Sequence, residues 1–144
     1  MTLTFTRDLD PLTSSGLELD DPSLDFRGRA VVDENARDIG TVADMLIDPQ
    51  LRVARLLVLE TGGGLLGMGK KHYLVPLEAA RDDGQQVRIN RSKDEITREP
   101  EYQLADGEEE ELQYVQAYTA YGIRPYWEVE AESPSTTTVE PESR

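Results

Sequence analysis

The stretch Val53-Ala54-Arg55-Leu56-Leu57-Val58-Leu59-Glu60-Thr61 decides the fold, because it is the most apolar run in the chain. It has the length of a strand, and consecutive apolar residues are typical of a strand covered on both faces. Asp48-Pro49-Gln50 precedes it with turn-forming residues, and a glycine-rich stretch from Gly62 to Gly69 follows it. We therefore expect a central strand with a tight connection at each end.

Working outward, further apolar runs of strand length are separated by short polar turns. The expected strands cover residues 26–32, 39–47, 71–77 and 86–91. Pro76 argues that its strand is an edge or contains a bulge, and Asp82-Asp83-Gly84 reads as a turn. Ser92 and Glu95 form a capping-box pattern for a short helix. Five or six strands joined by short turns predict a mainly β fold, a small antiparallel β-barrel or rolled sheet.

A helix is expected after the barrel, because Asp106-Gly107-Glu108-Glu109 offers a cap and a box residue. Gly122 and Pro125 suit its end. Five of the nine aromatic residues gather here: Tyr114, Tyr118, Tyr121, Tyr126 and Trp127. Two interpretations stay open: the helix packs on its own barrel, or it presents the aromatic residues to a partner or a second copy.

Acidic residues dominate the chain, which has 144 residues, 29 Asp and Glu, 15 Lys and Arg, and a formal net charge of −14. Residues 1–25 carry a net −5, residues 26–102 a net −1 and residues 103–144 a net −8. We therefore expect an acidic flexible segment over 1–25, a folded domain over 26–102, a helical aromatic-rich extension over 103–127 and a disordered tail over 128–144. Such a charge disfavours a simple polyanion binder.

Several classes of protein are excluded by composition. The chain has no cysteine, which excludes disulfides, thiolate zinc sites and cysteine nucleophiles. It has no apolar run of transmembrane length, and its start lacks the pattern of a signal peptide. We expect a cytoplasmic protein, in which twelve Arg against three Lys is consistent with the genome's composition or with a salt- or stress-tolerant host.

The glycine-rich stretch imitates two nucleotide-binding patterns. Gly62, Gly64 and Gly67 spell G-x-G-x-x-G, and Gly64, Gly69 and Lys70 spell G-x-x-x-x-G-K. Both patterns require a following helix, whereas a strand is expected here. We interpret the stretch as a hairpin connection in which Leu65, Leu66 and Met68 cover the mouth of the barrel.

Residues suited to catalysis or metal binding are few. His72 is the only histidine, and no carboxylate stands at helical or hairpin spacing to it, so we expect a structural or surface role. Asp48 is expected to form a turn, and the acidic run from Glu108 to Glu111 a solvated helix start. No enzyme site, cofactor or metal is expected.

The central segments taken together are similar to a known family. They read Val31-Val32-Asp33, Ile39-Gly40-Thr41-Val42, Leu46-Ile47-Asp48, Arg55-Leu56-Leu57-Val58-Leu59, Gly67-Met68-Gly69-Lys70-Lys71 and Leu74-Val75-Pro76-Leu77. In order and spacing they resemble the PRC-barrel domain, which is shared by the photosynthetic reaction centre H subunit and the ribosome maturation factor. The resemblance covers residues 26–102.

The resemblance implies a small β-barrel that contacts other macromolecules instead of performing chemistry. Our leading hypothesis is a non-enzymatic protein-interaction or assembly module that also forms homodimers. Its candidate interaction residues are Leu65, Leu66, Met68, Tyr114, Tyr118, Tyr121, Tyr126 and Trp127. The alternative is a ribosome or RNA assembly factor, using a basic face formed by Arg52, Arg55, Lys70, Lys71, Arg88, Arg91 and Lys93. The net charge disfavours direct RNA binding and excludes direct DNA binding, and a reaction-centre support role rests on the family alone.

Overall fold

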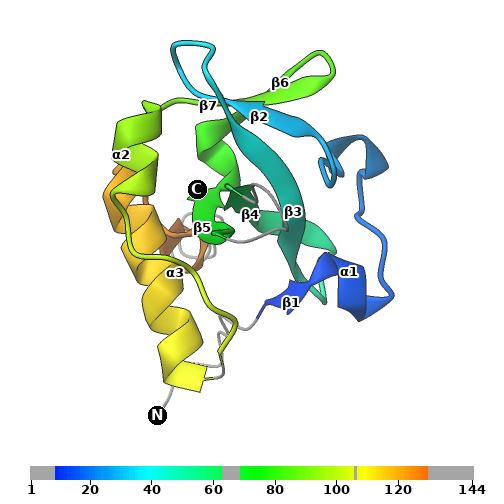
Figure 1. The fold of residues 1–144 in the computed structure, drawn as a ribbon. Coiled ribbons are helices and arrows are strands. Elements are labelled where there is room, and N and C mark those ends of the chain that lie inside the picture. Colours follow the sequence, from blue (N-terminus) through cyan, green and yellow to red (C-terminus); the bar gives the residue numbers. More distant parts are fainter. Residues whose placement is uncertain (1–8, 63–68, 106, 130–144) are drawn as a thin grey trace, which may run out of the picture.

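The computed structural model describes residues 9–62, 69–105 and 107–129. Its centre is a curled sheet, an open half-barrel with strand order β5-β4-β3-β2-β7-β6, and β1 pairs with β3 beside this path (Figure 1). The strands are β1 (Asp10–Pro11), β2 (Ala30–Val32), β3 (Asp38–Asp48), β4 (Val53–Thr61), β5 (Lys71–Pro76), β6 (Ala80–Asp83) and β7 (Gln86–Ile89). The helices are α1 (Leu12–Ser15), η1 (Pro22–Leu24), η3 (Leu77–Ala79), α2 (Lys93–Thr97) and α3 (Gly107–Tyr121). The mainly β fold is confirmed.

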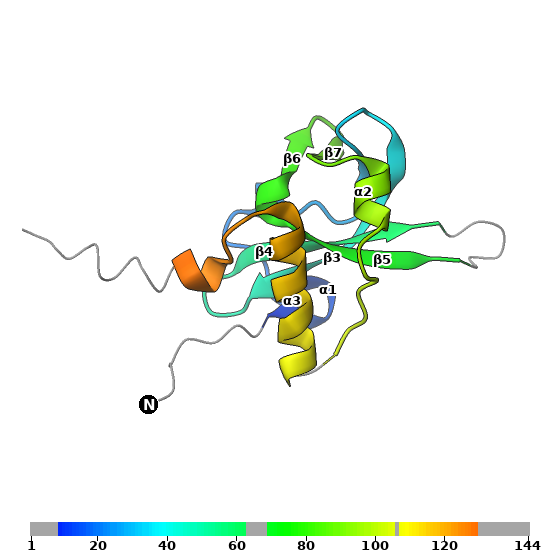
Figure 2. The same cartoon turned by 90° about the vertical axis from the view of Figure 1, so that its left-hand side faces the viewer.

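β4 is central and buried on both faces, as its apolar sequence predicts. Leu57 and Leu59 point into the interior of the half-barrel, whereas Leu56 and Val58 point to the layer that contains α3. Alternation of side chains along a strand therefore gives β4 a role in two hydrophobic clusters. Figure 2 shows α3 lying across this outer face of the sheet.

The strands β3 and β4 form an antiparallel pair from Thr41↔Glu60 to Asp48↔Val53, with irregularities that bend the sheet. Asp48 forms the turn between them, as expected, since its Oδ1 accepts hydrogen bonds from the N–H groups of Gln50 and Leu51 at 2.9 and 3.1 Å. Beyond β4, the described part of the connection leads into strand β5 and not into a helix. The two nucleotide patterns thus lack the helix that they require.

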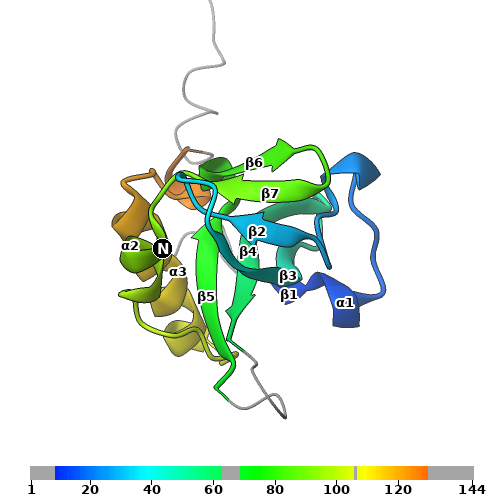
Figure 3. The same cartoon turned by 45° about the horizontal axis from the view of Figure 1, so that its top comes forward.

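The sheet is not wholly antiparallel, which corrects the predicted barrel. β2 pairs in parallel with β7, from Ala30↔Gln86 to Val32↔Arg88. The cause is β6, which the sequence analysis read partly as a turn because Ala80-Arg81-Asp82-Asp83 has little apolar character. β6 and β7 form a hairpin, and this hairpin brings β7 to β2 in the parallel direction (Figure 3). The expected strand over 26–32 is also shorter, since only Ala30–Val32 is extended in the sheet.

Residues 9–25 pack on the sheet, so the expectation of a flexible segment over 1–25 is wrong for this part; residues 1–8 lie outside the described residues. Leu9, Leu12 and Leu19 are buried. Thr13 donates two hydrogen bonds to Asp44 Oδ1, from its backbone N–H at 3.1 Å and its hydroxyl at 3.0 Å. The sequence does not predict this packing, because the three leucines do not recur at the spacing of a helix or a strand. Each nevertheless buries apolar area in the core.

The helical elements begin and end largely where their caps predict. Ser92 and Glu95 make both hydrogen bonds of a capping box at α2. α3 ends at Tyr121, and Gly122 follows with a φ of 65°. Residues 126–129 form a further helical turn, in which Glu128 and Val129 bond to the carbonyl of Pro125. The expected disordered tail over 128–144 is therefore wrong at its first two residues, and residues 130–144 lie outside the described residues.

Candidate interaction surfaces

The aromatic residues of the C-terminal extension meet in one compact group. The Tyr118 and Trp127 rings are 5.6 Å apart between centroids and nearly perpendicular, and those of Tyr126 and Trp127 are 5.1 Å apart. The guanidinium of Arg55 lies 4.6 Å from the centroid of the Tyr126 ring. The Tyr118 hydroxyl donates a hydrogen bond to the carbonyl of Arg55 at 3.3 Å. Edge-to-face and cation–π contacts of this kind hold the extension on β4.

These aromatic side chains belong to the core of the chain itself. Tyr114 and Tyr118 are fully buried, and Tyr121, Tyr126 and Trp127 are exposed by no more than 9%. The interpretation that the helix packs on its own barrel is therefore the one that the structure supports. The expectation that these five residues present a docking surface is wrong, because the outward apolar side chains of β4 and β5 require a cover. The other three candidates, Leu65, Leu66 and Met68, lie outside the described residues.

Glu110 is a buried carboxylate within the acidic start of α3, where the sequence analysis expected only solvated side chains. Its Oε2 accepts a 2.6 Å hydrogen bond from the Tyr102 hydroxyl, and its Oε1 accepts one from the N–H of Ala105 at 2.9 Å. Burial, together with Glu110, raises the pKa of Tyr102. The backbone N–H of Tyr102 also donates to the carbonyl of His72 at 2.7 Å. This network fastens the segment before α3 along β5 and covers that edge of the sheet.

Asp33 is a second buried carboxylate, with no exposed surface. It accepts hydrogen bonds from the N–H groups of Asn35, Arg37 and Lys93 at 2.8–2.9 Å and from Arg37 Nε at 3.0 Å. Burial alone would raise the pKa of Asp33, but these hydrogen bonds outweigh it and lower the pKa to about 2. With its oxygens engaged by the chain itself, Asp33 serves as a structural clamp.

His72 lies on the partly exposed surface of β5, as the sequence analysis expected. Its Nε2 is 3.1 Å from Glu60 Oε1, and Lys70 Nζ is 3.5 Å from Glu60 Oε2. The expectation that no carboxylate stands at hairpin spacing to His72 is wrong, because the pairing of β4 with β5 places Glu60 directly opposite His72. Within the described residues, no three His, Asp or Glu side chains are placed to hold a metal ion.

An exposed apolar feature formed jointly by the N-terminal segment and the sheet lies at the β3–β4 turn. A hollow of about 120 Å³ is lined by Leu19, Asp20, Asp21, Leu24, Arg52, Val53 and Ala54. Leu24 is 40% exposed at this hollow, and Leu51, which precedes Arg52 in the turn, is 53% exposed. The N–H of Asp20 bonds to the carbonyl of Arg52 at 2.8 Å and holds the two segments together. We call Leu24, Leu51 and this hollow the Leu24–Leu51 surface.

The sequence analysis missed the Leu24–Leu51 surface because its two halves are remote in sequence. Leu24 belongs to a segment that was expected to be flexible, and Leu51 to a turn that was expected to be polar. The one indication of this surface in the sequence was Leu51, an apolar residue directly after the turn residues Asp48-Pro49-Gln50.

The candidate basic residues do not all lie close together. Arg52 lies at the start of β4 and Lys70 beyond its end, so a nine-residue strand, about 26 Å long by the usual rise per residue, separates them. Lys70 pairs with Glu60, and Arg88 pairs with Asp83 at 2.9 Å. This arrangement does not favour the RNA-binding alternative.

Among the described residues, no helix combines the length and the apolar character needed to cross a membrane. No curated protein matches the chain. A family model, the PRC-barrel domain, matches residues 23–96, just over half of the chain. The match extends from η1 to α2 and so includes the half-barrel from β2 to β7. The chain belongs to the PRC-barrel domain family.

Proposed function

We propose that this PRC-barrel protein is a non-enzymatic interaction module that binds another protein at the Leu24–Leu51 surface. The observation that carries the proposal is an apolar hollow with the exposed Leu24 in its lining, together with the exposed Leu51 directly before the lining residue Arg52. A hollow lined by aliphatic side chains and rimmed by Asp20, Asp21 and Arg52 has the apolar centre and charged rim of protein interfaces.

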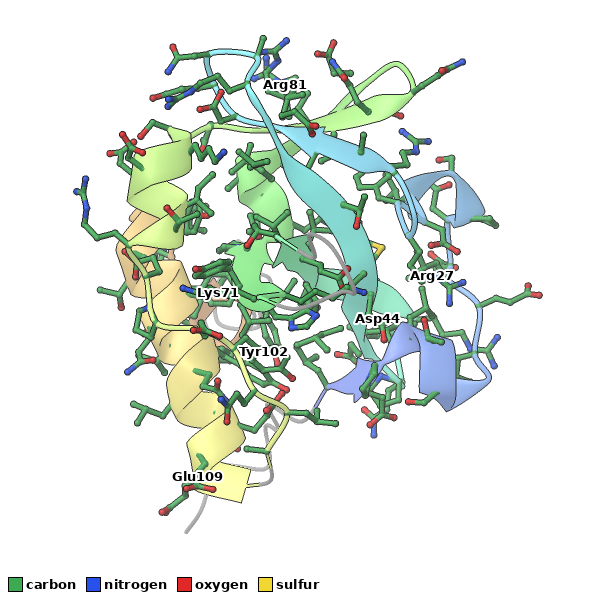
Figure 4. All side chains as sticks on the ribbon, viewed as in Figure 1. Arg27, Asp44, Lys71, Arg81, Tyr102 and Glu109 are labelled. Atoms are coloured by element: carbon green, nitrogen blue, oxygen red, sulfur yellow. The ribbon has the colours of Figure 1, made fainter. Side chains whose placement is uncertain are left out.

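The hydrogen bonds that hold the N-terminal segment in place support the same function. Asp44 anchors Thr13, and Arg27 donates to both the Thr13 hydroxyl at 3.2 Å and the Asp25 carboxylate at 2.7 Å. Figure 4 shows Arg27 and Asp44 close together beside α1. The N-terminal segment therefore reaches the hollow in a held conformation, which lowers the entropy lost when a partner binds.

The aromatic extension supports the module indirectly. Because Tyr114 and Tyr118 cover the outer face of β4, the extension completes the scaffold and leaves the Leu24–Leu51 surface for a partner. Removal of residues 103–144 would expose this face and would test stability instead of binding.

The test replaces the two leucines by charged residues. Full-length protein with Leu24→Asp and Leu51→Asp is compared with wild type as bait in native cell extract, followed by binding measurements with each purified partner. We expect the double variant to lose the partner while it unfolds at an unchanged temperature. Leu112→Asp is the control, since Leu112 is 56% exposed on α3. Equal recovery of the same purified partner by wild type and the double variant would refute the proposal.

A further inference from the structure

The two ends of the curled sheet differ. The edge of β5 is covered, since Tyr102 bonds to His72 and α3 packs alongside. β6 is the edge strand at the opposite end of the sheet, and among the described strands it pairs only with β7. Figures 1 and 3 show β6 at the margin of the sheet, away from α2 and α3. A terminal strand of this kind carries backbone groups that can pair with another chain.

The register of the hairpin shows which backbone groups face outward. Asp83 is paired with Gln86 across a two-residue loop, and the pair that flanks such a loop exchanges both hydrogen bonds. Hydrogen-bonded pairs alternate along the hairpin, and the bond from the N–H of Asn90 to the carbonyl of Ala79 at 3.1 Å fits this alternation. The N–H and C=O of Asp82 therefore point away from β7.

The side chains next to Asp82 carry opposite charges. Arg81 lies directly across from Arg88 on the outer face, and it has no hydrogen bond or ion pair among the described residues. Arg88, in contrast, donates two hydrogen bonds to Asp83 Oδ2. Arg81 is thus an exposed cation that makes no hydrogen bond, and it shares the one nearby carboxylate of its own hairpin, Asp83, with Arg88.

We propose that a second copy of this chain pairs with β6, as an antiparallel strand related by a two-fold axis at Asp82. In this register each Asp82 exchanges its outward N–H and C=O with Asp82 of the second copy. Arg81 then lies directly opposite Asp83 of the second copy, in a pair without hydrogen bonds, where side chains approach most closely. The interface therefore contains two pairs of opposite charge, because Arg81 of each copy faces Asp83 of the other.

Charge selects this register over its neighbours. A two-fold axis at Arg81 would place two arginines opposite each other, and an axis at Asp83 two aspartates, in both cases in a pair without hydrogen bonds, where side chains approach most closely. At the chosen axis the two Asp82 carboxylates come close, but each accepts a hydrogen bond from Arg29 Nη1 of its own chain at 2.8 Å. This homodimer rests on the proposed assembly role but uses a surface separate from the Leu24–Leu51 surface.

Sedimentation analysis of the full chain tests the dimer. We expect wild type to dimerise reversibly between about 10 µM and about 1 mM protein, at about 0.15 M salt to screen the net negative charge. Arg81→Glu should weaken the dimer by roughly tenfold or more, because it makes two like-charge contacts. Asp83→Lys should do the same. Arg98→Glu, directly after α2, is the control, because it makes the same charge change as Arg81→Glu and should leave the dissociation constant unaltered.

A mixture of the two variants gives the sharpest test. In a heterodimer of Arg81→Glu with Asp83→Lys, both cross-strand pairs join opposite charges again, so the mixture should recover dimers that neither variant forms alone. Recovery also shows that both variants fold. Monomeric wild type at the highest concentration, an undiminished Arg81→Glu dimer, or a mixture without recovery would each overturn the proposal. The Leu24→Asp, Leu51→Asp variant retains β6, so loss of its protein partner with retained dimerisation separates the two surfaces.

Discussion

The Asp33 carboxylate accepts a hydrogen bond from the backbone N–H of Lys93 at 2.8 Å, across 60 positions of the chain. Asp33 directly follows β2, and Lys93 is the first residue of α2, which follows the last strand of the sheet. One side chain therefore joins the end of β2 to the start of the helix that follows β7. The buried negative charge is neutralised by Arg37 and by three backbone N–H groups.

Asp33→Asn should destabilise the protein by about 2–3 kcal/mol, because charged hydrogen bonds are lost and an amide N–H₂ group faces other donors. Chemical denaturation of the variant and of wild type measures the difference. The exposed Asp38→Asn is the control and should change stability little. An Asp33→Asn protein as stable as wild type would show that the clamp is dispensable.

The same residue predicts acid sensitivity. The pKa of Asp33 is lowered to about 2 in the fold, so its contribution is fully present above its unfolded pKa and is lost as pH falls from about 4 toward 2. Thermal unfolding of wild type should show this loss in that window. Asp33→Asn should lack this part of the pH dependence, and an identical acid profile in both proteins would contradict the assignment.

Tyr118→Ala should cost about 3–5 kcal/mol of stability, because a fully buried ring is removed from contacts with Tyr126 and Trp127. Urea unfolding, followed by the fluorescence of the single tryptophan, measures it. Leu112→Ala on the exposed face of α3 should change stability by no more than about 0.5 kcal/mol. A small loss at Tyr118 would indicate that the aromatic group contributes little to the fold.

The sequence predicts the parts of this fold that depend on local chemistry. The apolar run of β4, the turn at Asp48 and the capping box at Ser92 each carry their physical cause within a few residues. The parallel pairing of β2 with β7 does not, since it depends on β6, whose Arg81 and Asp82 suit a strand only at the edge of a sheet. The apolar surface was missed for the same reason, because packing joins Leu24 to the β3–β4 turn.

Gly40→Ala should destabilise the protein by at least about 3 kcal/mol, because backbone strain and a steric overlap combine. Its φ is 151°, and a Cβ atom there would overlap the carbonyl oxygen of Glu60 in the neighbouring strand. Gly28→Ala separates the costs, since Gly28 has a φ of 83° but nothing within 4 Å of an added Cβ. The control should lose about 1 kcal/mol from backbone strain alone. Equal losses in the two variants, measured by urea unfolding, would exclude the steric contribution of the β3–β4 contact.

Alkaline titration tests the burial of the tyrosines. Burial raises the pKa of Tyr102, Tyr114 and Tyr121, and negative carboxylates nearby act in the same direction. Since an unfolded tyrosine has a pKa of about 10, stability should fall as pH rises above that value. Absorbance at the phenolate band should therefore show these tyrosines ionising together with alkaline unfolding. Tyr102→Phe should remove one of them from this step and weaken the hold of Glu110 on the segment before α3. Three phenols that ionised at pH 10 while the protein stayed folded would contradict their placement in the core.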